Sequence, residues 1–152
     1  MAIASILHLL PAVVWVGGMF FAYMALRPVA AGQLEPPARL ALWVGVFDRF
    51  FPWVFVSIAL ILGSGFWMVF AVFGGFAATG LYVHVMLVLG ILMMLIFLHV
   101  FFAPFRRLKQ AVDQEDWVGG GKRLAQIRVM IGINLLLGLA TIAVASGGRY
   151  LA

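Results

Sequence analysis

Three histidines carry the strongest ligand chemistry in this chain, because the segments around them are otherwise almost wholly apolar. They are His8, His84 and His99. An imidazole can bind a transition metal or a haem iron, and an ionisable side chain is costly to place inside a membrane span. Each histidine is therefore a candidate for a functional site. The position of each histidine along its helix determines which of the three can share a ligand.

Those helices are membrane spans, because the composition is far too apolar for a soluble domain. Hydrophobic residues make up 66% of the 152 residues, charged residues 10%, and the mean hydropathy is +1.16. Such a chain has room for four spans of about 20 residues each. We expect one membrane domain over residues 1–152, an all-α bundle of four transmembrane helices at about 3–25, 51–73, 81–104 and 125–146.

The polar connections between these spans predict short helices along the membrane interface. One is expected over 39–50, after the first helix closes at Arg27-Pro28, and another in the first half of 106–123. Gly119–Gly121 is expected to form a hinge before the fourth span. The apolar N-terminal run has no basic residues before it and continues past 20 residues, so we interpret it as a retained helix rather than a signal peptide.

The distribution of basic residues predicts the orientation of the bundle. The only lysine or arginine outside the first and third loops is Arg149. The other nine are Arg27, Arg39, Arg49, Arg106, Arg107, Lys109, Lys122, Arg123 and Arg128. The positive-inside rule then places the first and third loops in the cytoplasm and both termini on the opposite, outer side of the membrane. This topological reading also explains the net charge of +5 without any nucleic acid as partner.

The depth of each histidine follows from its place in its span. His8 and His84 stand near the starts of the first and third spans, which run in the same direction, so both should lie about 5–8 Å below the outer surface of the apolar layer. His99 should lie about 22 Å deeper, near the cytoplasmic face. His8 and His84 can therefore share a ligand, and His99 cannot join them.

A b-type haem fits this pair well. The first and third helices of an up-down bundle are diagonal partners about 11–14 Å apart, a gap that suits two imidazoles on a central haem iron and is wide for a bare metal ion. Trp15 follows His8 by two turns and would wall the same pocket, while Arg149 could meet a propionate. Residues without side-chain bulk that would help admit a porphyrin are Gly63, Gly65 and Gly90.

Several alternatives remain open for the same residues. The eight methionines suggest copper, because thioethers favour Cu(I), although methionines also fill apolar cores. His84 and Met86 are two residues apart and point to opposite sides of a helix, so they cannot chelate one ion. His8 and His84 could instead be hydrogen-bond partners between helices, and His99 could extend towards the cytoplasmic headgroups. Asn134 should make an interhelical hydrogen bond.

Some chemistries are excluded by what the chain lacks. Without cysteine there is no thiolate metal site, no disulfide and no covalent haem attachment. No acidic residue lies in the core of a predicted span, since Asp48 is in the interfacial segment, so a carboxylate proton relay is not expected. Hydrolytic catalysis has no constellation of residues to support it.

The stretch SILHLLPAVVWVGGMFFAYMALRP resembles the copper-resistance D (CopD-like) family of bacterial inner-membrane proteins, through its histidine, its W-x-G-G and its Arg-Pro exit. RLAQIRVMIGINLLLGLATIAVASGGRY in the fourth span is similar to the same family. This resemblance implies a bacterial inner-membrane protein linked to copper handling in the periplasm, so that the outer side, with both termini, is the periplasmic side. More distantly, His8 with Trp15 and the segment YVHVMLVLG resemble HemJ-type protoporphyrinogen oxidases, which bind haem b; those carry a lysine in the third helix, where this chain has Met86.

Three functional hypotheses follow. The first is a b-type haem protein with His8 and His84 as axial ligands, a membrane oxidoreductase that exchanges electrons with a quinone, a periplasmic redox protein or a metal. The second is copper binding or transport, with the same histidines and a periplasmic copper protein as partner; His99 is a weaker metal candidate in either case. The third is a non-catalytic subunit of a larger membrane complex.

Overall fold

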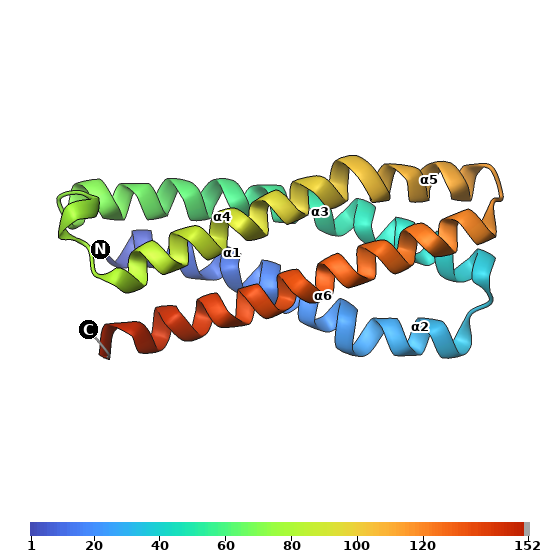
Figure 1. Ribbon diagram of the computed structural model, residues 1–152, viewed down its shortest axis with the longest axis horizontal. Helices are drawn as coiled ribbons and strands as arrows, with labels where there is room; N and C mark the ends of the chain where they lie inside the picture. Colours follow the sequence, from blue (N-terminus) through green and yellow to red (C-terminus); the bar gives the residue numbers. More distant parts are fainter. Residues whose placement is uncertain (151–152) are drawn as a thin grey trace.

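The computed structural model describes residues 1–150, except the side chain of Arg149, and shows four long helices with no strand among these residues (Figure 1). Four helices are long and apolar enough to cross a membrane: Ala2–Gln33, Pro36–Val72, Leu81–Asp113 and Trp117–Gly147. The predicted all-α fold with four membrane-spanning helices is therefore confirmed. The chain contains, in order, α1 (Ala2–Phe21), η1 (Ala22–Leu26), α2 (Arg27–Gln33), α3 (Pro36–Trp67), η2 (Met68–Val72), η3 (Phe76–Ala78), α4 (Leu81–Val100), η4 (Phe101–Phe105), α5 (Arg106–Asp113), α6 (Trp117–Gly147) and η5 (Gly148–Tyr150).

The helices extend further than the sequence predicted, and the segment 39–50 is not a separate interfacial helix. It is the first part of α3, which begins at Pro36, a position where the missing backbone N–H costs no hydrogen bond. Leu40, Trp43 and Phe47 are buried at helical spacing and pack this segment into the bundle. The first connection therefore shrinks to two residues, 34–35.

The first helix continues through Arg27-Pro28, which was expected to end it, and the third helix continues through Pro104. Arg27-Pro28 does not end the first helix, because a π-helical turn, η1, precedes it and the chain continues as α2. A second π-helical turn, η4, contains Pro104 and leads directly into α5. A local change of helical pitch is a common response to a proline that cannot donate to the preceding turn.

The three glycines at 119–121 do not form a hinge. Asp116 caps α6 by accepting a hydrogen bond at 2.9 Å from the backbone N–H of Gly119, so the helix begins before the glycines. Gly120 is buried, and a Cβ at this position would lie 2.9 Å from the Leu40 side chain. The glycine run thus allows close packing of α6 against α3 rather than bending.

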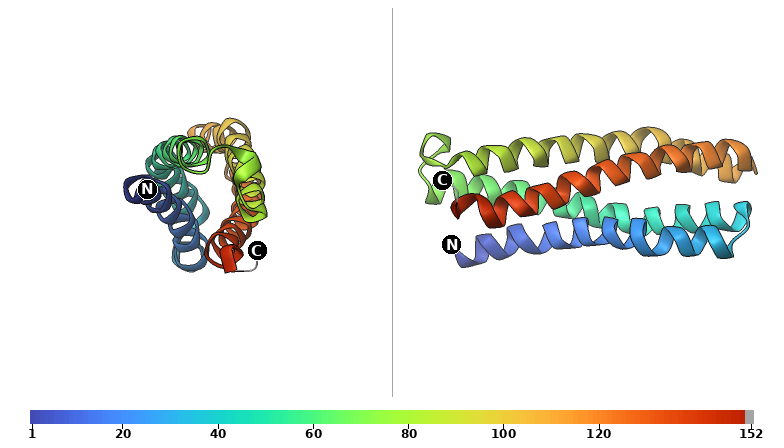
Figure 2. Two further views of the ribbon diagram at one scale, coloured as in Figure 1. Left: turned by 90° about the vertical axis from the view of Figure 1, so that its left-hand side faces the viewer. Right: turned by 60° about the horizontal axis from the view of Figure 1, so that its bottom comes forward.

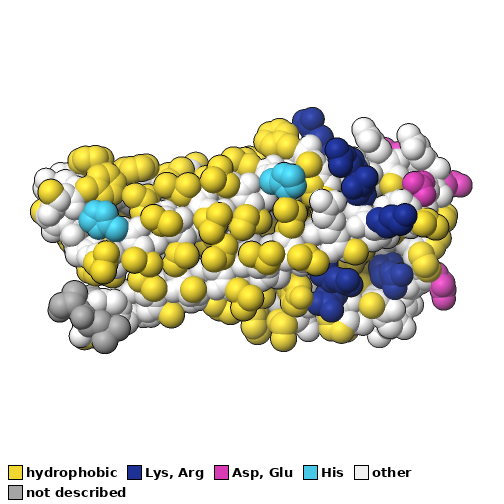
Figure 3. Space-filling model, viewed as in Figure 1, with side chains coloured by type: hydrophobic (Ala, Val, Ile, Leu, Met, Phe, Trp, Pro, Cys, Tyr) yellow, Lys and Arg dark blue, Asp and Glu magenta, His cyan; other side chains and the backbone are white. Residues whose placement is uncertain are grey.

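The four long helices alternate in direction around the bundle. α1 packs against α3, and α6 packs against α4 and α5, whereas α1 and α4 stand opposite each other (Figure 2). One end of the bundle holds both the N-terminus and the loop 73–80, and we call it the histidine end because His8 and His84 lie near it (Figure 1). The other end holds the loops 34–35 and 114–116 and the gathered lysines and arginines, and we call it the basic end (Figure 3).

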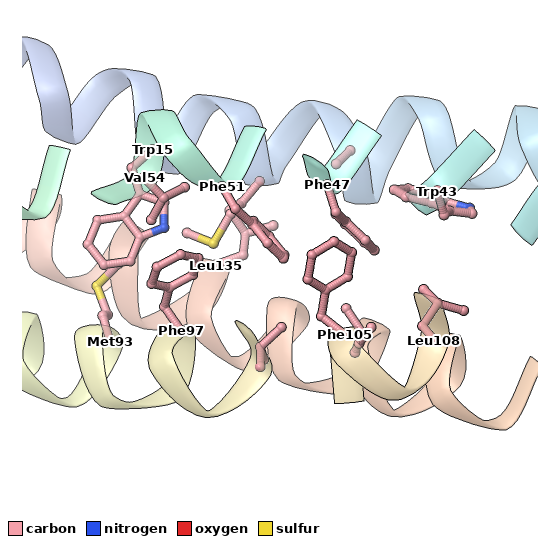
Figure 4. Packing of buried hydrophobic residues seen from close by; sticks show 14 of the residues in the cluster. Trp15, Trp43, Phe47, Phe51, Val54, Met93, Phe97, Phe105, Leu108 and Leu135 are labelled. Atoms are coloured by element: carbon pink, nitrogen blue, oxygen red, sulfur yellow. The ribbon is translucent and has the colours of Figure 1, made fainter. Parts of the chain in front are cut away.

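The buried core occupies the middle and the basic half of the bundle. An aromatic row runs along it, with ring centroids 5.2 Å apart for Trp43 and Phe47, 5.0 Å for Phe47 and Phe51, and 5.3 Å for Phe51 and Phe97 (Figure 4). Towards the histidine end the packing loosens, because no residue of 81–92 is buried and only Ala4 is buried in 2–10. Contact between helices in lipid depends on such side-chain packing, so the two halves differ in how tightly their helices are held.

Two contacts join the helices at mid-span, and the second of them was predicted. Gly18 lies against the Phe50 ring of α3, which leaves no space for a Cβ, while Gly17 faces open space. The Asn134 side chain donates to the Met93 carbonyl oxygen at 3.3 Å and so links α6 to α4, as expected from its place in the fourth span. Asn134 Oδ1 has no partner among the described residues.

Candidate functional site at the histidine end

His8 lies in the second turn of α1 and is half-buried against α3. Its Nδ1 is 3.1 Å from Ser64 Oγ, and its ring lies 3.1 Å from the position that a Cβ on Gly65 would occupy. Ser64 Oγ in turn donates to the Leu60 carbonyl oxygen at 2.5 Å. Because the serine proton is committed to Leu60, Nδ1 of His8 is the donor in the contact with Ser64, and the Nε2 lone pair is left for a ligand.

His84 lies in the first turn of α4 and is also half-buried. Its Nδ1 is 3.3 Å from the carbonyl oxygen of Gly80, and its ring centroid is 6.0 Å from that of Phe76 in the preceding loop. A carbonyl oxygen can only accept, so Nδ1 must carry the proton here too. Nε2 is again the nitrogen with a free lone pair.

The two histidines therefore share one protonation pattern at the same end of the bundle. Histidines that bind metals typically donate their second ring N–H to a protein oxygen, which holds the ring and makes the ligating nitrogen more basic. His8 and His84 both satisfy this condition, through a serine hydroxyl and a backbone carbonyl. The residues present thus fit the donor chemistry of a metal ion or a haem iron.

The structure does not bring the two rings into contact. The ring of His8 packs on α3 and that of His84 on its own N-terminal loop, and no hydrogen bond or ring contact joins them among the described residues. Within the same residues no group of three or more histidine, cysteine, aspartate or glutamate side chains could hold a metal ion. The site is therefore two single imidazole donors on diagonal helices rather than a closed coordination sphere.

His99 stands apart from this pair. It is exposed on α4, about four turns beyond His84 and on the far side of the mid-span core residue Met93. It makes no hydrogen bond within the described part of the chain. The separation of His99 from His8 and His84 agrees with the spacing along the third helix.

Trp15, two turns after His8 on the same helix, packs into the buried core. Its side chain is 3% exposed, and its ring packs edge-on against Phe97 at 6.2 Å, beside Met93 (Figure 4). Of the glycines expected to admit a porphyrin, Gly65 contacts His8, while the Cβ positions of Gly63 and Gly90 face open space. Arg149, expected near a propionate, has a side chain outside the described part of the structure.

The sequence did not predict the hydrogen-bond partners of His8 and His84. Ser64 is one of few polar residues in its apolar stretch and lies between Gly63 and Gly65, so its polarity was the available signal. The role of Gly80 is carried by its backbone carbonyl, which no side-chain pattern reveals. Met93 and Met94 are buried core residues, in line with methionine as a packing residue.

Comparison with known proteins identifies one family. Residues 44–147, more than half of the chain, match the model of the family called copper resistance protein D (CopD). No curated protein and no solved structure matches the chain. The matched segment contains His84, Ser64 and the fourth helix, whereas His8 precedes it. The chain therefore belongs to the CopD family and is a multi-pass membrane protein related to copper resistance.

Proposed function

We propose that this protein handles copper as its cargo and binds it at the histidine end through Nε2 of His8 and Nε2 of His84. One observation carries the proposal: both rings donate Nδ1–H to a protein oxygen, which leaves the same nitrogen of each ring for a metal. Membership in the CopD family supports copper as the metal.

The donors near this end suit copper better than the hard cations. Imidazole and thioether are ligands for copper, whereas Mg²⁺ and Ca²⁺ prefer carboxylate and carbonyl oxygens. The chain has no aspartate or glutamate between residues 49 and 112, so no carboxylate from α4 or the second half of α3 competes for the site. For both rings to bind one ion, α1 and α4 must approach each other at this end of the bundle, where no residue of 81–92 is buried.

The proposed site faces the periplasm. The basic end carries nine of the ten lysines and arginines, so the positive-inside rule assigns it to the cytoplasm and the histidine end to the outer side of a bacterial inner membrane. A periplasmic copper or redox protein is then the partner that exchanges the ion.

A b-type haem is the second candidate for the same two histidines. The diagonal placement of α1 and α4 favours it, because a porphyrin spans a gap that a bare ion does not. A haem would supply one-electron chemistry with a quinone or a periplasmic protein, and His8 and His84 would hold its iron. Trp15 and Arg149 remain proposed neighbours in this case.

Copper titration of the purified protein in detergent tests the proposal. Cu(I) affinity is measured by competition with a chromophoric chelator for the unchanged chain and for His8→Ala, His84→Ala and His99→Ala. We expect each of the first two variants to bind copper at least about tenfold more weakly. His99→Ala is the matched control, since it removes an imidazole from the same helix as His84, and its affinity should be unchanged.

An absorption spectrum of protein produced with ample haem separates the two candidates. A Soret band that disappears in both His8→Ala and His84→Ala would show that the two histidines bind haem rather than copper. Equal copper affinity in all four proteins, together with no Soret band, would contradict both candidates. The histidines would then only join helices, as in a non-catalytic subunit of a larger complex.

A further inference from the structure

An open cavity lies at the basic end, far from the histidines. It has a volume of about 670 Å³ and is lined by the first helix from Ala22 to Ala31, by the start of α3 and by the start of α6. Trp43 and Phe47 form its buried apolar wall, and Trp117 lines it from α6. A volume of this size is in the range of sites for small molecules.

Three arginines from three different helices line this cavity: Arg27, Arg39 and Arg128. Arg27 stacks on the Tyr23 ring at 4.6 Å, and one Arg39 Nη donates to the Ala31 carbonyl oxygen at 3.4 Å. These contacts orient two guanidinium groups without neutralising them.

None of the three arginines forms an ion pair with an acidic side chain within the described part of the chain. None of the cavity-lining residues is an aspartate or a glutamate. Within the described part of the chain, the one ion pair joins Lys109 to Asp48 at 2.8 Å, and neither residue lines the cavity. The cavity therefore concentrates three positive charges next to an aromatic wall, an arrangement that attracts an anion.

We propose that this cavity binds the phosphate group of an anionic phospholipid. Guanidinium groups match phosphate oxygens in geometry, and basic pockets between membrane helices are suited to anionic headgroups. The apolar wall suits the part of a lipid next to its phosphate. Met24 and Val118 also line the cavity and are 56% and 73% exposed, so apolar surface leads from it towards the acyl chains of the bilayer. The proposal does not depend on the copper site, which lies at the opposite end.

Native mass spectrometry of the full chain, released from detergent, tests this proposal with phosphatidylglycerol and phosphatidylcholine as probes. The test variant is Arg27→Gln/Arg39→Gln/Arg128→Gln. The control is Arg106→Gln/Arg107→Gln/Lys122→Gln, which removes the same charge from the same end but outside the cavity. We expect about fivefold weaker phosphatidylglycerol binding per cavity arginine, or about one hundredfold for the triple variant, and a much smaller change in the control.

Three results would overturn the proposal: equal weakening in both triple variants, no preference for phosphatidylglycerol over phosphatidylcholine, or inorganic phosphate binding as tightly as the lipid. The last would assign the cavity to a free anion. Should the triple variant fail to fold, the single variant Arg128→Gln decides in its place. Arg128 is exposed, and its loss should weaken lipid binding about fivefold, whereas Lys122→Gln should not.

Discussion

At the scale of single residues, the hydrogen bonds of His8 and His84 indicate their proposed role as metal ligands better than their positions in the sequence do. A histidine near the end of an apolar helix can be a ligand or only a hydrogen-bond partner, and its sequence context does not distinguish the two. The two roles differ in which ring nitrogen makes a hydrogen bond within the protein and which keeps a free lone pair for a metal. Nδ1–H of His8 donates to Ser64 Oγ, and the Ser64 hydroxyl donates to the Leu60 carbonyl oxygen. Nε2 of His8 is therefore the ring nitrogen with a free lone pair.

Ser64 therefore has a predicted role that its neighbours lack. Ser64→Ala removes the acceptor for His8 Nδ1–H, and we expect copper affinity, or haem retention, to fall about tenfold, because partners of metal-binding histidines commonly contribute this much. The measurement is the Cu(I) competition titration described above. Ser146→Ala is the control, since Ser146 also donates to a carbonyl four residues earlier, that of Ile142, but contacts no histidine. Similar losses in both variants would argue against the positioning role of Ser64.

At the scale of elements, the contact between α1 and α3 places His8. The helices approach closely where Gly18 meets the ring of Phe50, and the same pair of helices brings His8 to Ser64 nearer the histidine end. A Cβ at position 18 would overlap the Phe50 ring, so a larger residue there requires the ring or the helix to move. The adjacent Gly17 faces open space, so the sequence pair Gly-Gly contains one packing residue and one that is free to vary.

This difference predicts opposite outcomes for two neighbouring substitutions. Gly18→Leu should destabilise the folded bundle by about 1–3 kcal/mol, because the added side chain forces α1 and α3 apart. Gly17→Leu should stay within about 0.5 kcal/mol of the unchanged protein. Thermal denaturation in detergent measures both. If Gly17→Leu proved as destabilising as Gly18→Leu, the contact with Phe50 would not be the cause.

At the scale of the whole molecule, the two ends of the bundle differ in both charge and packing. Lysine and arginine gather at the basic end, and the face seen in Figure 3 is otherwise mostly hydrophobic. The aromatic core from Trp43 to Phe97 holds this half together, while the histidine end lacks buried residues over 81–92. The tightly packed half anchors the four helices, and fewer side chains are buried in the half that carries His8 and His84.

The charge asymmetry predicts the orientation of the chain in the membrane. A periplasmically active reporter, such as alkaline phosphatase, fused after residue 152 should be active, and one fused within the loop 114–116 should be inactive. The reverse pattern would move the histidine end to the cytoplasmic side. It would leave the pairing of His8 with His84 at one end unchanged, because both helices begin there.

Hydropathy and charge along the chain were sufficient to predict the helical class, the four membrane-spanning helices and the separation of His99 from the other two histidines, while the CopD family was indicated by a resemblance of sequence motifs. These properties depend on local composition and on the constant rise of a helix. The continuity of α3 from Pro36, the capping of α6 by Asp116 and the core position of Trp15 emerged only in the tertiary structure. So did the bond from His8 to Ser64 and the cavity with three arginines. The reason is physical: the rotation of each helix about its axis is set by the packing of all four helices together, and that rotation decides which side chains meet.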